Sequence, residues 1–160
     1  MWRFWTVVIV PLAVLAGCQH GGPKQPARRP VANLEVVEQH WPDGKLRLRK
    51  EVLRNADGSL TNHGAYARWY DNGQKEYETT FVHGKKHGTT TQWHRNGRKW
   101  TEEHHVDGQR QGKSTTWDES GRKLREESYA DDKPHGTWTV WHQDGRIKWR
   151  TTFDHGKPAP

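Results

Sequence analysis

The chain contains a single cysteine among 160 residues, so no disulfide can form within it. Leucine, isoleucine and valine are also scarce: hydrophobic residues make up 31% of the sequence, and 14 of them lie within the first eighteen residues. A remainder this poor in aliphatic side chains cannot build the deep core that most enzyme folds need. Eight of the ten tryptophans lie beyond Cys18 and argue against disorder there, because disordered segments are short of aromatic residues. We therefore expect a thin folded structure that buries its rings locally.

The longest hydrophobic run is short and lies near the N-terminus. Residues 6–15 form a ten-residue stretch interrupted only by a proline, after a single positive charge at Arg3. This is too short for a bilayer core of roughly 30 Å, which takes about 20 apolar residues, but it suits a signal peptide. The stretch ends in LAGC at Cys18, which resembles the lipobox of bacterial lipoproteins. The resemblance implies a cleaved signal peptide at residues 1–17 and a diacylglyceryl group on the Cys18 thiol. The alternatives are an ordinary secretory signal that contains a cysteine, or a short anchor.

Residues 18–33 are expected to form the acylated cysteine and a tether. They contain three prolines, two glycines and several basic residues, a composition typical of a solvated linker. In the lipoproteins that this N-terminus resembles, an Asp after the cysteine retains the protein in the inner membrane. Gln19 stands there instead, so we expect a lipid anchor in the outer membrane, facing the periplasm; the inner membrane and the cell surface are the alternatives. The net charge of +7 suits nucleic acid, a membrane surface or an acidic protein, and export argues against nucleic acid.

A 24-residue repeat fills most of the remaining chain. Each unit opens with a glycine, has a tryptophan five residues later and a second glycine four residues after that. These residues are Gly64, Trp69 and Gly73, then Gly88, Trp93 and Gly97, then Gly112, Trp117 and Gly121, and finally Gly136, Trp141 and Gly145. The units span residues 64–87, 88–111, 112–135 and 136–160. A degenerate unit at residues 34–63, with about five extra residues, precedes them and is predicted to be the N-terminal cap.

Each unit is predicted to be a β-hairpin. The second glycine follows Asn, Ser or Asp, and such pairs accept the positive φ angles of tight hairpin turns. The flanking segments are rich in Thr, Trp, Tyr and Phe, which favour strands. Since an isolated hairpin is marginal in water, neighbouring units must pair edge to edge. The expected fold is all-β, an elongated single-layer meander of stacked hairpins. At the other turn of the third unit, Asp132 replaces a glycine, which predicts local strain or a different turn.

The repeat resembles the MORN-variant family, whose units combine a glycine, a tryptophan, an Asn-Gly turn, a later aromatic residue and a second glycine turn. The resemblance covers about residues 41–157, nearly all of the mature chain. The sequence departs from the family in mostly lacking a second tryptophan, which only the last unit has, as Trp138. Bacterial members are often described as YwqK-like antitoxins, and arrays of this type associate with membranes or proteins. The resemblance therefore implies a binding role.

No catalytic or cofactor motif stands out. The chain lacks the G-x-S-x-G and H-E-x-x-H motifs and has no free cysteine nucleophile. Eleven histidines suggest a metal, but His104 and His105 are adjacent on an expected strand and would point to opposite faces. Three others, His63, His87 and His135, each precede a unit-opening glycine and are interpreted as turn residues. We therefore expect no enzyme activity, no cofactor and no metal site.

Binding of a partner protein in the periplasm is the leading functional hypothesis. The family resemblance suggests an immunity or antitoxin role against an envelope-acting toxin, such as a phospholipase or a cell-wall hydrolase. The basic residues expected to attract an acidic partner are Lys85, Lys86, Arg95, Arg98, Lys99 and Arg110. The alternatives are an envelope structural lipoprotein that binds peptidoglycan or anionic lipid, and a glycan-processing enzyme. Trp69, Trp93, Trp117 and Trp141 form a column that is interpreted as structural. The alternative is a stripe of exposed rings that binds nucleic acid. The oligomeric state, the hairpin register and the binding face stay open.

Overall fold

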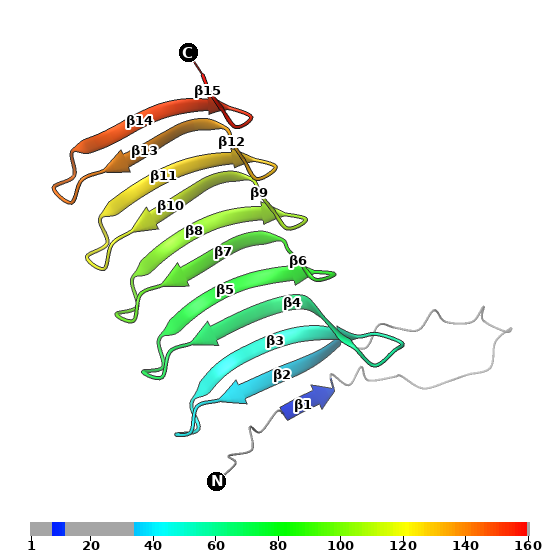
Figure 1. Cartoon of the computed structure of the whole chain (residues 1–160). Coiled ribbons are helices and arrows are strands. Elements are labelled where there is room, and N and C mark those ends of the chain that lie inside the picture. The colour runs from blue at the N-terminus through cyan, green and yellow to red at the C-terminus, as the bar shows by residue number, and fades with distance from the viewer. Residues whose placement is uncertain (1–7, 12–33, 160) are drawn as a thin grey trace, which may run out of the picture.

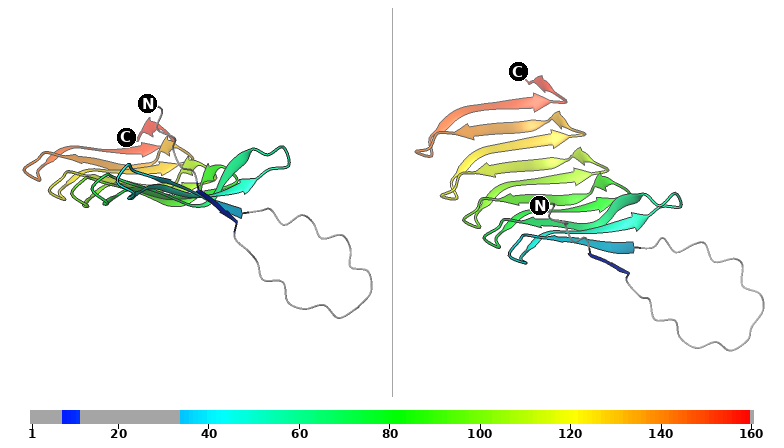
Figure 2. Two further views of the ribbon diagram at one scale, coloured as in Figure 1. Left: turned by 90° about the horizontal axis from the view of Figure 1, so that it is seen from below. Right: turned by 60° about the horizontal axis from the view of Figure 1, so that its bottom comes forward.

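The computed structural model describes residues 8–11 and 34–159, which form one antiparallel sheet of fifteen strands (Figure 1). The strands follow one another across the sheet in chain order, with three two-residue strands set beside the main path. Figure 2 shows that the described strands form a single curved layer. The predicted all-β meander of stacked hairpins is thereby confirmed. Cys18, the predicted tether and most of the predicted signal peptide lie outside the described residues. The described part of the chain holds no helix long and apolar enough to span a membrane.

Four strands make up the N-terminal part of the sheet. They are β1 (Val8–Pro11), β2 (Leu34–His40), β3 (Leu46–Arg54) and β4 (Leu60–Trp69). β1 pairs with β2 at the outer edge, so four residues of the predicted signal peptide form a strand in the full chain. The β3–β4 hairpin is longer than the later hairpins and extends beyond the edge of the sheet (Figure 1). The extra residues of the degenerate unit lie in this hairpin.

The rest of the sheet is built from one design that recurs every 24 residues. A six-residue strand runs from the unit glycine to the column tryptophan, and an eight-residue strand pairs with it antiparallel. After a second turn, a two-residue strand pairs with the end of the eight-residue strand. The six-residue strands are β7 (Gly88–Trp93), β10 (Gly112–Trp117) and β13 (Gly136–Trp141), and the end of β4 takes this place in the first unit. The eight-residue strands are β5 (Lys75–Val82), β8 (Lys99–Val106), β11 (Lys123–Ala130) and β14 (Ile147–Asp154). The two-residue strands are β6 (Lys85–Lys86), β9 (Gln109–Arg110), β12 (Lys133–Pro134) and β15 (Lys157–Pro158).

The first turn of each unit carries the Asn-Gly, Ser-Gly or Asp-Gly pair. In the first unit Gly73 donates its N–H to the Tyr70 carbonyl at 3.0 Å, and Tyr70 donates to the Gln74 carbonyl at 2.9 Å. Gly73 has a φ of 85°, whereas Asn72 is not among the residues with positive φ. This pattern is typical of a type I turn followed by a glycine bulge. The turn position agrees with the sequence prediction, but only one residue of each pair is left-handed.

In the second turn of each unit, both residues are left-handed. His83 and Gly84 have φ angles of 47° and 80°. The corresponding residues of the third unit, Asp131 and Asp132, have φ angles of 50° and 64°. Two successive positive φ angles are the mark of a type I′ turn, whose twist matches that of the flanking strands. Asp132 therefore adopts a backbone conformation that Asp takes less readily than Gly, as the sequence predicts.

One face of the sheet holds most of the buried side chains. Side chains alternate between the two faces along each strand. The register of strand pairing then sets which side chains are neighbours on one face. The buried residues on this face are Glu35, Val37, Val52, Tyr77, Thr79, Thr90, His105, Ser114 and Tyr129. On the opposite face, Thr91 and Thr139 are the only buried ones among the described residues. We name the first surface the aromatic face, because it also carries Tyr66, Phe81, Trp138, Trp149 and Phe153.

Candidate binding surface

Aromatic rings from neighbouring strands contact one another on the aromatic face. Tyr66 on β4 packs edge-on against Tyr77 on β5, with ring centroids 5.8 Å apart. Near the C-terminus Trp138 packs against Tyr129 and Phe153, at centroid distances of 5.2 and 4.9 Å. Such pairs stabilise by about 0.5–1.5 kcal/mol beyond the area that they bury. The rings therefore hold the thin sheet together in place of a deep core.

A polar cluster occupies the middle of this face, where other units have a ring. His105 stands at the repeat position of Phe81 and Tyr129, and its exposed fraction is only 4%. Its Nδ1 lies 3.3 Å from Thr90 Oγ1, and its Nε2 lies 3.6 Å from a carboxylate oxygen of Glu103. Burial lowers the pKa of His105, and this effect exceeds the opposing one of Glu103. The imidazole is therefore held neutral at neutral pH.

The order of hydroxyl, imidazole and carboxylate in this cluster is that of a hydrolase triad, but its burial differs. Thr90 has no exposed surface, and its hydroxyl shares a 2.7 Å hydrogen bond with the hydroxyl of Thr79. A substrate carbonyl cannot approach a nucleophile that is sealed in this way. The cluster instead links β5, β7 and β8 through buried hydrogen bonds.

Two cations lie over rings next to this cluster. The Nζ atom of Lys86 lies 5.6 Å from the centroid of the Tyr77 ring. One unit later, the guanidinium carbon of Arg110 lies 3.8 Å from the centroid of the Tyr129 ring. Burial raises the pKa of Tyr129 to about 12, so its phenol keeps its proton under the cation. These contacts align cations and rings along the same face.

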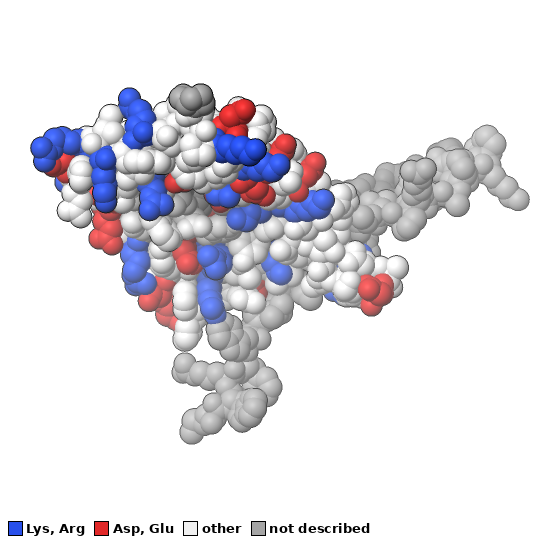
Figure 3. All heavy atoms as spheres, turned by 45° about the horizontal axis from the view of Figure 1, so that its top comes forward, with Lys and Arg blue, Asp and Glu red and all other residues white. Residues whose placement is uncertain are grey.

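The cations on this face lie beside carboxylates. Three such pairs, with their N–O distances, are Lys86–Glu103 at 3.9 Å, Arg110–Asp132 at 3.0 Å and Arg125–Glu127 at 3.9 Å. Figure 3 shows acidic and basic side chains interspersed over the visible surface. Phosphate groups of a nucleic acid or an anionic lipid would therefore meet a negative charge next to these cations. The surface is better suited to a partner that itself carries both signs of charge.

The six basic residues predicted to attract an acidic partner do not form one patch. Lys85, Lys86 and Arg110 lie on β6 and β9 at the second-turn edge, whereas Arg95, Arg98 and Lys99 lie at the first-turn edge. The two groups are separated by the length of a strand, on the order of 20 Å. Arg95 and Lys99 are also paired, with Asp71 and Glu102 respectively. The structure therefore divides this predicted site into two halves.

The column tryptophans line the first-turn edge, where they are half-buried at the strand ends. Side chains of one unit donate hydrogen bonds to the column carbonyls of the next. These bonds run from Trp41 Nε1 to Trp69 at 3.3 Å, from the Tyr70 hydroxyl to Trp93 at 2.8 Å, and from His94 Nε2 to Trp117 at 3.0 Å. The edge thus joins neighbouring units through the main-chain carbonyls of the column residues.

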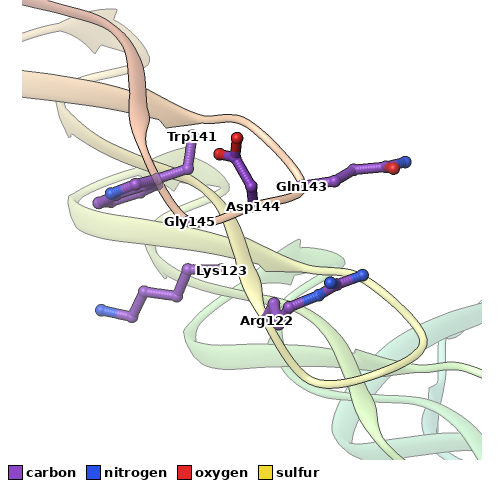
Figure 4. A pocket seen from close by; sticks show the side chains of 6 residues that line it. All are labelled: Arg122, Lys123, Trp141, Gln143, Asp144 and Gly145. Atoms are coloured by element: carbon purple, nitrogen blue, oxygen red, sulfur yellow. The ribbon is translucent and has the colours of Figure 1, made fainter.

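A hollow of about 460 Å³ opens at the first-turn edge between the third and fourth units (Figure 4). Its lining consists of Arg122, Lys123, Trp141, Gln143, Asp144 and Gly145. In the earlier units, the amides of Asn72 and Asn96 each donate a 2.8 Å hydrogen bond to a carbonyl of the next turn. At the equivalent position the Ser120 hydroxyl donates a 2.6 Å hydrogen bond to the Asp118 carboxylate within its own turn. The hollow therefore opens where the repeat exchanges its bridging amide for a short hydroxyl.

Sequence reasoning did not single out two features of the structure. The first is the polar centre at His105, whose signal was an imidazole at an aromatic position of the repeat. The second lies at the second-turn edge of the last unit. There His135, Asp154 and His155 bring potential metal-ligand atoms within 4.8 Å of one another. Their signal was a constant spacing of twenty residues between facing turn positions, visible only once the register is known.

Comparison with known families agrees with this architecture. Residues 62–83, which cover most of the first unit, match the family model described as MORN repeat variant. No curated protein matches the chain. The match indicates a repeat-based binding module similar to MORN arrays, which are typically non-catalytic.

Proposed function

We propose that this chain is a non-enzymatic, membrane-anchored binding protein of the periplasm, and that it binds a partner protein through the aromatic face. The observation that carries the proposal is the set of accessible Trp and Arg side chains along one face of an open single-layer sheet, namely Trp138, Trp149, Arg110 and Arg125. Trp and Arg are among the residue types that dominate the hot spots of protein interfaces. A rigid, repeat-built surface presents them without further folding, which reduces the entropy lost on binding.

The nature of the partner follows from the charges on this face. Because its cations lie beside carboxylates, a protein of mixed charge fits it better than a polyanion. The resemblance to YwqK-like antitoxins supports an immunity role, in which the partner is an envelope-acting toxin such as a phospholipase or a cell-wall hydrolase. The competing role is an envelope structural lipoprotein that binds peptidoglycan or anionic lipid.

A pair of exposed tryptophans on opposite faces provides the test of the binding face. Trp149 lies on the aromatic face with 43% of its surface exposed, and Trp100 lies on the opposite face with 45% exposed. The full-length chain is used as bait in an envelope extract. The experiment is done with and without the product of the gene next to this chain's own gene, where a cognate toxin would be encoded. Calorimetry at two salt concentrations then measures the affinity of the recovered protein.

We expect one saturable protein partner, whose binding is weakened by Trp149→Ala and unchanged by Trp100→Ala. Equal effects of the two substitutions would argue against the aromatic face. Recovery of peptidoglycan or anionic lipid alone, with no saturable protein partner, would overturn the immunity role in favour of the structural one.

The anchor is tested separately at Cys18. Metabolic labelling with a fatty acid should mark the wild-type chain and leave Cys18→Ser as an unlabelled, unprocessed precursor. Fatty-acid label retained on the Cys18→Ser variant would refute the lipoprotein proposal.

A further inference from the structure

The second turns of successive units are joined by a backbone hydrogen bond. In the last unit Gly156 donates its N–H to the Pro134 carbonyl at 2.7 Å, and in the first unit Gly84 donates to Asn62 at 2.8 Å. Each bond holds the tip of a turn against the chain just before a unit glycine. The residue that precedes that glycine is thereby placed beside the first residue of the turn, twenty positions later.

Four pairs of side chains face each other in this way along the second-turn edge. They are His63–His83, His87–Asp107, Gln111–Asp131 and His135–His155. Three of the pairs consist wholly of groups that can ligate a metal, and two are pairs of imidazoles. The ring centroids are 4.8 Å apart in the His63–His83 pair and 4.6 Å apart in the His135–His155 pair.

The last pair differs from the first by a third group. Asp154 precedes His155, whereas Val82 precedes His83. One carboxylate oxygen of Asp154 lies 2.6 Å from Nδ1 of His155 and 3.4 Å from Nδ1 of His135. All three side chains are exposed, so solvent can reach them.

We propose that His135, Asp154 and His155 form a binding site for a divalent transition-metal ion of the Zn²⁺ class. Two imidazoles and a carboxylate are a ligand set that such ions accept, and water completes the coordination at an exposed site. Ligating histidines must be neutral, and the ion takes the place of the hydrogen bond between Asp154 and His155. His135 lies between β12 and β13, Asp154 ends β14, and His155 lies in the turn that leads to β15, so the bound ion fastens the end of the array.

The test titrates the full-length chain, free of any affinity tag and stripped with a chelator, with Zn²⁺ in a calorimeter. Three conservative variants remove one ligand each: His135→Gln, Asp154→Asn and His155→Asn. Gln111 occupies the position of His135 in the second unit, and Asn tolerates the left-handed φ of 44° at His155. Circular dichroism checks that each variant stays folded.

The first unit supplies the matched controls. His83→Asn alters the imidazole pair that lacks a carboxylate, and Val82→Asp rebuilds the complete ligand set there. We expect one tightly bound Zn²⁺ in the wild type, an affinity at least about tenfold weaker in each ligand variant, and no loss in His83→Asn. Val82→Asp should add a second equivalent of similar affinity.

Two results would overturn the site. One is the lack of saturable Zn²⁺ binding by the wild type, and the other is binding that the three ligand variants leave unchanged. Failure of Val82→Asp to add a second equivalent would refute the claim that the carboxylate completes the site.

Discussion

The guanidinium of Arg110 lies 3.8 Å from the ring centroid of Tyr129, in the next unit of the array. The same side chain also reaches Asp132, whose carboxylate accepts hydrogen bonds from the Arg110 backbone N–H and from Nε, both at 3.0 Å. These bonds lower the pKa of Asp132. Asp132 is the residue that occupies a glycine position with a φ of 64°. Arg110 therefore offsets a strained turn and covers a buried ring at once.

This relationship predicts that Asp132→Gly acts differently in two backgrounds. In the wild type the substitution relieves a left-handed conformation worth about 1–2 kcal/mol but loses the carboxylate bonds to Arg110. In an Arg110→Ala chain the loss is smaller, because only the hydrogen bond from the backbone N–H of residue 110 is left to lose. The rise in melting temperature should therefore be larger in the Arg110→Ala background, as measured by calorimetry on the four chains. Equal shifts in both backgrounds would show that the two residues are not coupled.

The buried imidazole of His105 predicts a pH-dependent stability. Its pKa is lowered in the folded chain, so the unfolded chain binds the proton more readily. Stability should thus be lost as the pH falls from about 7.5 through the ordinary histidine pKa of about 6.5. His105→Phe restores the ring of the other units and should reduce this fall in melting temperature. His104→Phe, on the opposite face, is the matched control, and a fall that persists in His105→Phe would assign it elsewhere.

Closing the hollow between the third and fourth units should stabilise the array. Ser120→Asn introduces a side-chain amide like those of Asn72 and Asn96, each of which donates a hydrogen bond to a carbonyl of the next turn. One such hydrogen bond contributes about 0.5–1.5 kcal/mol to the free energy of unfolding, which urea denaturation measures. The reverse change, Asn96→Ser, should lower it by a similar amount. A stabilised Asn96→Ser chain would contradict the role of the bridging amide.

The tryptophan column predicts a gradient along the array. Trp93 and Trp117 have units on both sides, whereas Trp41 lies near the start. A fully buried Trp→Ala costs about 3–5 kcal/mol, and we expect about half of that for these half-buried rings. The fall in melting temperature should be larger for Trp93→Ala and Trp117→Ala than for Trp41→Ala. If the melting temperature falls equally and negligibly in all three variants, the rings face solvent and are available for binding.

The sequence by itself determined the architecture of the repeat array. Glycines and tryptophans at a constant period mark turns and strand ends, and a hairpin that cannot bury its own edges must pair with its neighbours. Even the unusual turn at Asp132 was visible as a departure from the period. The anchor at Cys18 is likewise read from sequence alone and stays a prediction.

Only the tertiary structure decided which side chains meet. A shift of one residue in register moves every side chain of a strand to the other face, and the repeat leaves that register open. The pairing therefore settled that His105 is buried beside Glu103 and that the six predicted basic residues lie at two opposite edges. It also brought His135 within reach of His155, because a backbone bond between turns joins residues that the sequence keeps twenty positions apart.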